Sequence, residues 1–329
     1  MTITSGNPYV FVTGCARSGT TLLQRMMDNH GELAVTNDTR LIPASLFGTD
    51  AGKDLPLTEA LVAEIVDYKW FGHVGIERGD AMRIAAEIST FAEFVAALLD
   101  EFARRRGKAL AGEKVPQYVR RIPLIRRLFP DARVVHLIRD GREVALSTLD
   151  WVTPTRFLGR LPLWQEEPIA VCALWWHRQM SSAILARDQA GTGQWYHEVR
   201  YEHLAADADS TMRMLAEFLG LAHDPATVRF HEGRTVDNPK WSAKKRWLPP
   251  TSGLRDWRLN LPERDLQLFE VIAGDVLKAL DYPLATGGNV PDDVVARAQY
   301  CRERWLAETM AVRTPAQRPG SRPADPAAC

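Results

Sequence analysis

A strand, a glycine-bounded loop and a helix in direct succession are the most constraining feature of this chain. The β-branched and aromatic residues at positions 9–13 predict a buried strand, and the apolar spacing over residues 20–30 predicts a helix. The loop between them, residues 14–19, reads GCARSG. Backbone N–H groups and the helix dipole at such a junction favour a bound anion. The alternative is a tight strand–helix turn with an N-cap.

The residue types of this loop agree with a phosphate site. Gly14 and Gly19 allow the backbone to approach oxygen atoms closely, and Arg17 adds a cation. The hydroxyl donors are Ser18, Thr20 and Thr21. A Walker A loop would have lysine where Thr20 stands, so the pattern argues against a nucleoside triphosphatase. The pattern favours a ligand whose phosphate carries a group other than the further phosphates of a nucleoside triphosphate.

Strand and helix patterns alternate along the rest of the chain. Further strands are expected at residues 109–112, 133–138 and 195–200. Helices are expected at residues 57–68, 91–106, 119–129, 140–150, 168–189, 211–219, 261–280 and 291–310, and a long irregular loop at residues 235–257. This alternation predicts an α/β fold with a P-loop-like, mostly parallel sheet and helices on both faces.

The composition argues against several classes of protein. Lys+Arg and Asp+Glu both number 41, so the net charge is zero. The chain therefore lacks the overall positive charge that is typical of nucleic-acid-binding proteins. The four cysteines share no short spacing, which argues against a metal site or a disulfide framework. Residues 1–8 are polar and the apolar runs are short, so we expect no signal peptide, no membrane span and a cytoplasmic location.

A second candidate anion site follows the strand expected at residues 133–138. Arg139 would emerge at the carboxyl end of that strand, where open α/β sheets place their ligands. Ser147 follows about two helical turns later and can project from the same side. An arginine fork and a hydroxyl suit a second phosphate. An ion pair between Arg139 and Asp140 explains the motif equally well, and Asp140 could also be mistaken for a Walker B magnesium ligand.

The two motifs together carry a family resemblance. RSGTTL after a strand, followed by RDGR between a strand and a helix that carries Ser147, resembles the sulfotransferases that use 3′-phosphoadenylyl sulfate (PAPS). NDTRLIP at residues 37–43, LFP at 128–130 and VRYE at 199–202 resemble the tyrosylprotein-sulfotransferase-like branch most closely. We therefore expect a sulfotransferase domain at residues 8–285, a C-terminal helix at 286–313 and a disordered tail at 314–329.

The resemblance implies how the donor is bound. PAPS would be the co-substrate and adenosine 3′,5′-bisphosphate (PAP) the product, with no metal expected. Residues 240–258 resemble the family's mobile loop over PAPS. The matching binding positions are Arg17, Ser18, Gly19, Thr20 and Thr21 for the 5′-phosphosulfate, Arg139 and Ser147 for the 3′-phosphate, Tyr201 against the nucleotide, and Ser242 and Lys244 in the loop.

Sulfuryl transfer needs a general base for the acceptor hydroxyl and cations for the charge that develops on the leaving oxygen. The resemblance aligns Asp38 with the base and Lys114 with the catalytic lysine, and Arg17 and Arg40 would stabilise charge on the transferring group. Without the resemblance, Asp38 is explained as an N-cap or turn residue, Arg40 as a surface cation and Lys114 as a solvated loop charge.

The histidines and tryptophans give weaker signals. Cytosolic small-molecule sulfotransferases use a histidine shortly after the lysine, and none lies between Lys114 and Val135. His136 falls inside an expected strand, which indicates a core or sheet residue. The other histidines considered as substitutes are His30, His73 and His177. Most tryptophans should be core, but Trp164, Trp241 and Trp247 lie in irregular stretches and are candidates for an acceptor cleft.

These observations favour a PAPS-dependent sulfotransferase whose acceptor is a hydroxyl of a small molecule, lipid, carbohydrate or tyrosine. One alternative is a P-loop kinase or NTPase, which would need Mg²⁺ and ATP. Another is a non-catalytic nucleotide-binding protein, paired as a homodimer through the helix expected at residues 291–310.

Overall fold

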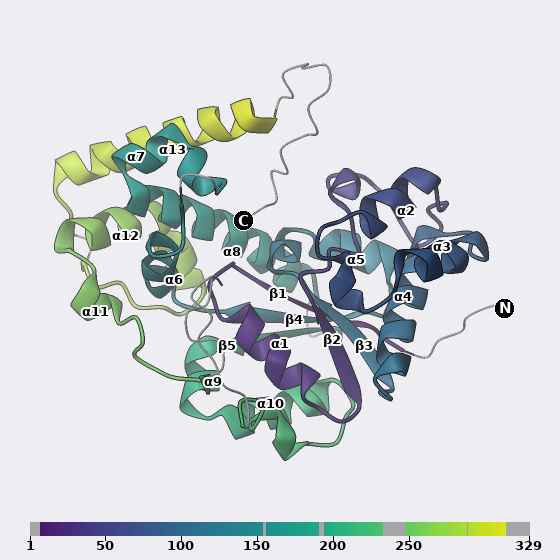
Figure 1. Cartoon of the computed structure of the whole chain (residues 1–329). Coiled ribbons are helices and arrows are strands. Elements are labelled where there is room, and N and C mark those ends of the chain that lie inside the picture. Colours follow the sequence, from purple (N-terminus) through teal and green to yellow (C-terminus); the bar gives the residue numbers. More distant parts are fainter. Residues whose placement is uncertain (1–6, 154–155, 191–193, 233–247, 288, 314–329) are drawn as a thin grey trace. The chain divides into compact units, whose positions relative to one another are not determined.

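Five parallel strands form a sheet in the computed structural model, in the spatial order β2-β3-β1-β4-β5 (Figure 1). Their bounds are β1 Val10–Gly14, β2 Leu33–Asn37, β3 Leu110–Lys114, β4 Arg133–Ile138 and β5 Tyr196–Arg200. Because all five strands run the same way, their carboxyl ends meet at one edge of the sheet. The parallel sheet confirms the predicted fold class.

The structure describes residues 7–153, 156–190, 194–232, 248–287 and 289–313. The chain divides into two units by its internal contacts. Unit 1 comprises Met1–Cys15, Gly19–Ile138 and Ala183–Ser252, and unit 2 comprises Ala16–Ser18, Arg139–Ser182 and Gly253–Cys329. The whole sheet belongs to unit 1. The expected domain at residues 8–285 stays a prediction, and the expected tail at 314–329 lies outside the described residues.

Helices cover both faces of the sheet in unit 1. Alternate strand residues point to opposite faces, so Phe11 and Val134 pack into one core and Val12 and Val135 into another. The first core is covered by α2 Glu59–Val66, α3 Arg78–Ala86, α4 Phe91–Arg105 and α5 Ile122–Leu128, and the second by α1 Thr20–Asp28, α9 Tyr201–Ala206 and α10 Ala208–Phe218. Helices on both faces were predicted from the sequence.

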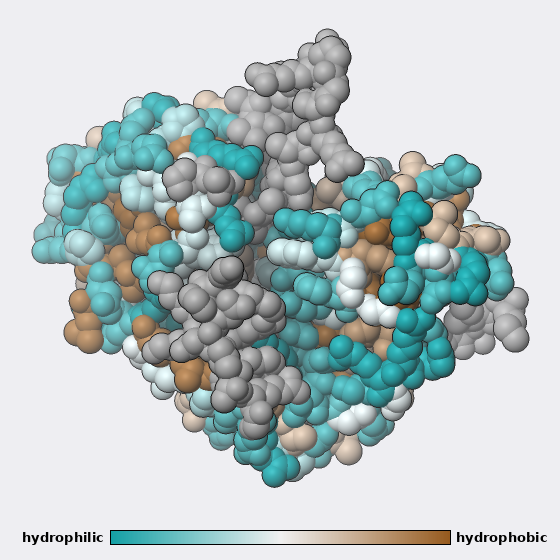
Figure 2. Space-filling model, in the orientation of Figure 1, coloured by the Kyte–Doolittle hydropathy of each residue, from teal (hydrophilic) through white to brown (hydrophobic). Residues whose placement is uncertain are grey.

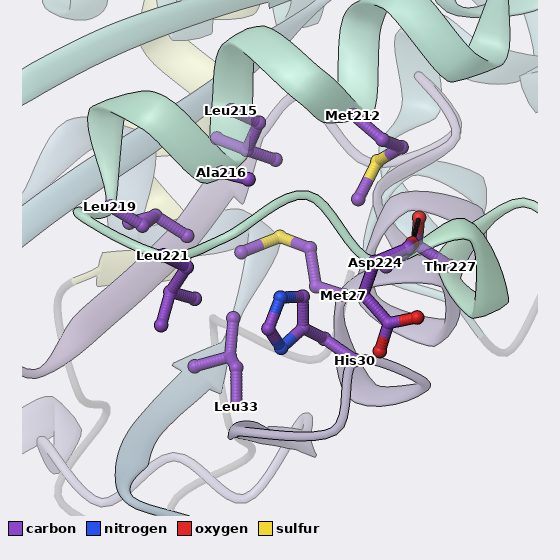
Figure 3. A pocket seen from close by; sticks show the side chains of 10 residues that line it. All are labelled: Met27, His30, Leu33, Met212, Leu215, Ala216, Leu219, Leu221, Asp224 and Thr227. Carbon is purple, nitrogen blue, oxygen red and sulfur yellow. Dashed lines mark hydrogen bonds between the residues drawn. The ribbon is translucent and has the colours of Figure 1, made fainter.

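Polar side chains predominate over much of the face of the molecule in Figure 2, although apolar patches interrupt them. Among the described helices, none combines the length and the apolar character that crossing a bilayer requires. A small apolar cavity of about 10 Å³ lies between α1 and α10, where the His30 ring points toward Leu33 and Leu221 (Figure 3). A space of that size holds no more than one water molecule. Leu33 begins β2, so this cavity lies at the opposite end of that strand from its carboxyl end.

Unit 2 is helical in its described residues. Its helices are α6 Gly141–Leu149, α7 Pro162–Glu166, the larger part of α8 Pro168–Ala190, α11 Trp257–Asn260, α12 Glu263–Ala279 and α13 Asp292–Arg313. Short 3-10 turns also occur, at Ala44–Leu46, Phe71–Val74, Pro116–Arg120 and Pro225–Thr227 in unit 1 and at Leu158–Arg160 in unit 2. The helix expected at residues 119–129 is a 3-10 turn followed by α5, and Pro123 lies in the first turn of α5, where proline is tolerated.

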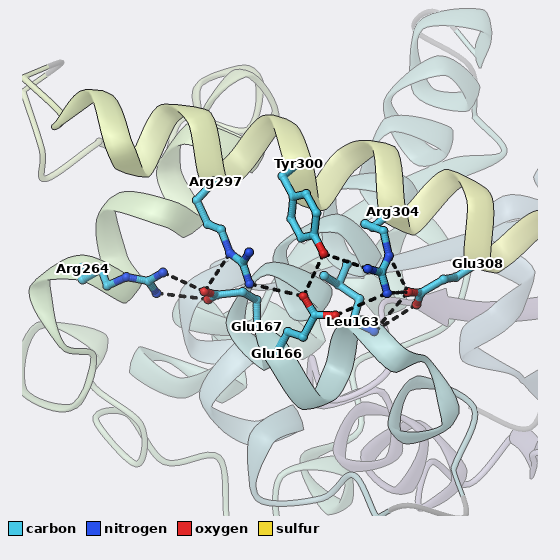
Figure 4. Close-up of polar contacts among 8 residues, drawn as sticks. All are labelled: Leu163, Glu166, Glu167, Arg264, Arg297, Tyr300, Arg304 and Glu308. Carbon is cyan, nitrogen blue, oxygen red and sulfur yellow. Dashed lines mark hydrogen bonds and ion pairs between the residues drawn. The ribbon is translucent and has the colours of Figure 1, made fainter.

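Charged contacts hold the C-terminal helix on its neighbours (Figure 4). Glu167, which follows α7 and is buried, accepts hydrogen bonds from Arg264 of α12 at 2.7 Å and from Arg297 of α13 at 3.0 Å. The hydroxyl of Tyr300 on α13 donates to Glu166 at 2.9 Å. The same helix also contributes buried apolar residues such as Trp305. These contacts fix α13 against α7 and α12 within unit 2.

Arg142 on α6 is a fully buried cation in unit 2. Its guanidinium donates to Asp140 at 2.7 Å and to Glu270 of α12 at 2.6 Å. It also lies 3.8 Å from the centroid of the Trp257 ring, within cation–π range. Because an unpaired buried charge is unfavourable, these partners must all be present around the guanidinium. Arg142 therefore ties the helix that follows β4 to α11 and α12.

Replacing Arg142 with alanine should lower the free energy of unfolding by about 3–5 kcal/mol, because two buried carboxylates lose their cation. Denaturant unfolding followed by circular dichroism measures the change. Arg213→Ala is the control, since Arg213 and its partner Asp209 are exposed, and it should cost less than about 1 kcal/mol. Equal losses in the two variants would contradict the role given to Arg142.

Candidate active site

Residues that the sequence analysis selected lie at or directly after the carboxyl end of each strand in the described sheet. The loop at residues 14–19, which we call the anion loop, begins at the last residue of β1. Asp38 comes directly after β2, and Lys114 is the last residue of β3. Arg139 is the first residue after β4, and Tyr201 is the first after β5. Open parallel sheets bind their ligands at this edge. The sequence missed β2, so it did not foresee that Asp38 stands at the end of a strand.

Two glycines allow the anion loop to pass close to its neighbours in unit 1. A Cβ atom on Gly14 would lie 2.5 Å from the backbone oxygen of Leu137, a distance that no larger residue tolerates. Gly19 has a φ of 104°, in the left-handed region, and a Cβ there would lie 2.8 Å from the Tyr201 ring. Tyr201 therefore packs against the loop, and its hydroxyl donates to the backbone oxygen of Thr251 at 3.1 Å.

The middle of the loop belongs to unit 2 and brings the two candidate anion motifs together. Arg17 Nε donates to Ser147 Oγ at 3.1 Å, so a residue from each motif shares one hydrogen bond. The hydroxyl oxygen of Ser18 is buried and has no hydrogen-bond partner among the described residues. Buried polar atoms are nearly always paired in proteins. An anion at this loop would accept the hydrogen bond that the Ser18 hydroxyl can donate.

Positive charge is concentrated around Arg17. Burial and, to a smaller extent, the charges of Arg255, Arg139 and Arg156 together lower the pKa of Arg17 to about 10, while the charge of Asp150 opposes them. The Arg17 guanidinium also lies 5.4 Å from the centroid of a Trp151 ring. Several guanidinium groups that disfavour one another's charge are stabilised by a shared anion. This part of unit 2 is therefore suited to a phosphate or sulfate group.

The motif after β4 includes an ion pair that the sequence analysis did not predict. Arg139 donates to Glu143, one helical turn later on α6, at 2.7 and 2.9 Å. Asp140 caps the N-terminus of α6 by accepting from the Arg142 backbone N–H, and it also pairs with the Arg142 side chain. Asp140 therefore has a structural explanation. Arg139 would exchange Glu143 for a phosphate if it binds one.

Asp38 and Lys114 meet in unit 1. Lys114 Nζ donates to Asp38 Oδ2 at 2.8 Å and to Thr21 Oγ1, in the first turn of α1, at 3.2 Å. The Lys114 side chain is fully buried, whereas that of Asp38 is 23% exposed. Lys114 is therefore not the solvated loop charge of the alternative explanation. Lys114 joins the first turn of α1 to a carboxylate that solvent can reach.

Residues 38–41 form a tight loop that a buried acid supports. Asp38 and Arg40 have φ values of 57° and 52°, in the left-handed region that disfavours residues other than glycine. Glu113 of β3 accepts hydrogen bonds from the Thr39 hydroxyl at 2.7 Å and from the Leu41 backbone N–H at 2.9 Å. The sequence analysis did not select Glu113. Its signal was a lone carboxylate inside the short strand LAGEK.

Aromatic side chains lie beside the same loop, and the sequence analysis missed two of them. Arg40 lies 5.2 Å from the centroid of the Tyr68 ring, and His73 Nδ1 is 2.6 Å from the Asn37 backbone oxygen. Trp70 stacks on His73 at 6.1 Å between ring centroids and contacts Tyr68 edge-on at 6.2 Å. We call Tyr68, Trp70 and His73 the aromatic shelf. Trp70 is 38% exposed, so the shelf presents an indole surface to solvent.

The remaining candidates lie elsewhere or outside the described residues. His136 is buried on β4 with Nδ1 2.7 Å from the Tyr196 hydroxyl, as expected for a sheet residue. His30 lines the small cavity, and His177 contacts Asp275. Trp164 is half-buried on α7 rather than in an irregular stretch. Outside the described residues lie Ser242, Lys244, Trp241 and Trp247.

The arrangement suits transfer of an anionic group to an acceptor that a carboxylate activates. Within unit 1, a buried lysine contacts a partly exposed carboxylate and the first turn of the helix that follows the anion loop. In the part of the chain that the structure describes, no group of three or more His, Cys, Asp or Glu residues could hold a metal ion.

Comparisons with known proteins agree with this chemistry. Residues 8–225, more than half of the chain, match the model of the sulfotransferase family. The chain is similar to protein-tyrosine sulfotransferase A of Caenorhabditis elegans, with 24% identity over 300 residues, 88% of this chain and 72% of the relative. It is also similar to protein-tyrosine sulfotransferase 2 of Gallus gallus, with 26% identity over 231 residues, 68% of this chain and 54% of the relative.

Two solved structures share the fold. The sulfotransferase domain from the curacin biosynthetic pathway has a TM-score of 0.60 and 19% identity, covering 84% of this chain and 99% of its own. The sulfotransferase domain of the Synechococcus PCC 7002 olefin synthase has a TM-score of 0.55 and 20% identity, covering 84% and 96%. A P-loop kinase is not favoured by these matches. The chain belongs to the sulfotransferase family, with relatives in its protein-tyrosine branch, and it is an enzyme of sulfuryl transfer to a hydroxyl-bearing acceptor.

Proposed function

We propose that this sulfotransferase takes its sulfuryl group from PAPS and transfers it to an acceptor hydroxyl that Asp38 deprotonates. The observation that carries the proposal is the position of Lys114 Nζ, 2.8 Å from Asp38 Oδ2 and 3.2 Å from Thr21 Oγ1. One ammonium group therefore contacts both the carboxylate and the first turn of α1, which follows the anion loop. An acceptor activated at Asp38 would lie close to an anion bound at that helix start.

Donor binding is assigned to the residues that match the family motifs. The 5′-phosphosulfate would lie on residues 14–21, where the Ser18 hydroxyl would donate to it and its charge would stabilise Arg17. Arg139 and Ser147 would bind the 3′-phosphate, and Tyr201, which packs against Gly19, would contact the nucleotide. The chemistry of these donors fits a doubly anionic ligand. Ser242 and Lys244 stay predictions of the sequence.

The transfer step follows from the charges at the carboxyl edge of the sheet. Asp38 accepts the acceptor's proton while the acceptor oxygen bonds to sulfur. The bond between sulfur and the bridging oxygen of PAPS breaks, and negative charge grows on that oxygen as PAP leaves. Lys114 and Arg17 stabilise this charge, and Arg40 stabilises the transferring group. Because Lys114 is fully buried, its charge is poorly screened by solvent and acts strongly at short range.

Calorimetry with PAP tests the donor site directly. The wild-type chain should bind PAP without Mg²⁺. Arg139→Ala should weaken that binding by about tenfold to a hundredfold, because loss of a charged hydrogen bond costs about 1.5–3 kcal/mol. Arg213→Ala, an exposed arginine, is the control. A chain that ignores PAP but binds MgATP would contradict the proposed donor.

The role of Asp38 as base is tested with Asp38→Asn, which keeps the size of the side chain and removes its basicity. Turnover of PAPS with a hydroxyl acceptor should fall by about 10²- to 10⁴-fold, the usual contribution of general base catalysis. Mass spectrometry that follows the gain of one SO₃ group in the acceptor measures it. PAP affinity should stay near that of the wild type. Undiminished turnover would assign the base to another residue.

A phenolic acceptor is favoured by two observations. The relatives described above are protein-tyrosine sulfotransferases. The aromatic shelf contacts the residue before Asp38 and the second residue after it, because His73 bonds to Asn37 and Tyr68 packs with Arg40. A carboxylate is a weak base, and a phenol, with a pKa near 10, releases its proton far more readily than an alkyl alcohol. An aryl ring stacked on Trp70 would place such a hydroxyl near Asp38.

Trp70→Ala should therefore lower kcat/KM for phenols about tenfold, the value of one stacking contact, while leaving PAP affinity unchanged. The measurement compares a set of phenols with aliphatic alcohols of similar size. Met82→Ala is the matched control, since Met82 on α3 is also about 40% exposed and lies outside the shelf. An equal effect of Trp70→Ala on both acceptor classes would remove the shelf as a binding surface. The cytoplasmic location and a homodimer through α13 stay predictions of the sequence.

A further inference from the structure

Glu113 is a buried acid next to the catalytic residues that the proposed mechanism does not use. Its side chain is fully buried on β3, on the opposite face of the strand from Lys114. Oε1 accepts from the Thr39 hydroxyl at 2.7 Å and from the Leu41 backbone N–H at 2.9 Å. Oε2 is buried without a hydrogen-bond partner in the described part of the chain. A buried carboxylate is costly, so its presence here calls for an explanation beyond packing.

The residues that Glu113 holds determine where Asp38 and Arg40 point. Thr39 stands between these two residues and is itself fully buried, and the Thr36 hydroxyl of β2 lies 2.8 Å from its hydroxyl. The Asp38 backbone N–H donates to the Lys114 backbone oxygen at 2.8 Å. Asp38 and Arg40 both have positive φ values, a conformation that persists only where surrounding contacts enforce it. Glu113 supplies two of those contacts.

We propose that Glu113 is a positioning residue for sulfuryl transfer, which acts through Thr39 and Leu41 to hold Asp38 and Arg40 in their reactive arrangement. The inference rests on the proposed function, because it assigns catalytic roles to Asp38 and Arg40. Glu113 itself touches neither substrate. Its hydrogen bonds cross from β3 to the loop after β2, so the strand that carries Lys114 also orients the base that Lys114 contacts.

The charge of Glu113 makes the inference testable by pH. Burial, with a smaller contribution from the charge of Asp38, raises the pKa of Glu113 to about 7, although the hydrogen bonds from Thr39 and Leu41 lower it. Tyr118, in the turn after β3, is a titratable group near Glu113. Burial and the negative charge of Glu113 raise the pKa of Tyr118, and the positive charge of Arg40 lowers it. Above pH 7 the carboxylate is ionised and accepts stronger, charge-assisted hydrogen bonds. Below pH 7 a proton can occupy Oε2 while Oε1 still accepts weaker ones.

Activity and stability should therefore respond to Glu113 in opposite directions. A carboxyl group whose pKa is raised in the folded state stabilises the fold at low pH, and this contribution is lost as pH rises through about 7. Glu113→Gln is uncharged at every pH and should be more stable than the wild type at pH 8. The same variant should have a lower kcat at pH 8, because its amide oxygen holds Thr39 and Leu41 less strongly.

The experiment measures kcat, KM and thermal unfolding of the wild type and Glu113→Gln from pH 6 to pH 8. We expect similar kcat values at pH 6 and a kcat about tenfold lower in the variant at pH 8, since small misplacements of catalytic groups are costly. PAP affinity should stay unchanged at both values. Glu167→Gln is the matched control, because Glu167 is also a buried glutamate and the side chains that donate to it, Arg264 and Arg297, are not among the proposed site residues (Figure 4). It should change stability without changing the pH profile of kcat.

Thr39 variants test the same contact from the other side. Thr39→Val keeps the shape but removes the hydroxyl donor and should lower kcat, whereas Thr39→Ser should restore it. In the double variant, Thr39→Val should lower kcat little beyond the effect of Glu113→Gln, since both changes remove the same hydrogen bond. A ratio of wild-type to variant kcat that is constant from pH 6 to pH 8 would overturn the inference. So would kcat values that fall in step with the melting temperature.

Hydrogen–deuterium exchange separates this inference from the proposed function. The backbone amides of residues 38–41 should exchange faster in Glu113→Gln than in the wild type at pH 8, and this readout needs no substrate. If the wild type transfers nothing from PAPS, the proposed function fails whatever the exchange shows. If transfer occurs but exchange and kcat are unaffected by Glu113→Gln, only the positioning role fails.

Discussion

A buried ammonium group is the constraint on which the active-site region depends. Lys114 is fully buried at the end of β3, and its charge requires partners within hydrogen-bond distance. It finds them in Asp38 after β2 and Thr21 at the start of α1. Both partners are within reach only because β3 lies between β2 and β1 in the sheet. The strand order therefore decides which carboxylate and which helix start the lysine can join.

The chain has no net charge, yet it separates charge locally. Several arginines lie near Arg17, and their positive charges repel one another. An anion bound in that part of unit 2 would relieve this repulsion. In unit 1, a buried glutamate supports a loop that carries an aspartate and an arginine in unfavourable backbone conformations. Both arrangements lower the free energy of unfolding and have no structural benefit of their own. Proteins tolerate such local costs mainly at functional sites.

Several features were predictable because they depend on residues close together in the chain. The anion loop, the strand at residues 133–138 and the helices on both sheet faces follow from local patterns, and the structure agrees with them. The strand β2 was missed because its five residues lie at the sheet edge and carry little alternation. Without β2, Asn37 and Asp38 looked like a turn. The pairing of Arg139 with Glu143 was also not foreseen, since it depends on the geometry of α6.

By itself, the sequence determined the fold class, the order of the anion motifs and the membership of a sulfotransferase family. These depend on periodicity and on residue types at fixed spacing. Tertiary structure alone decided that Glu113 lies beneath the loop of Asp38, that Trp70 and His73 stand beside it, and that Arg17 bonds to Ser147. Those contacts join residues far apart in the chain. Their formation depends on which strands are neighbours in the sheet and on which side chains each face of the sheet buries. A local sequence pattern predicts neither.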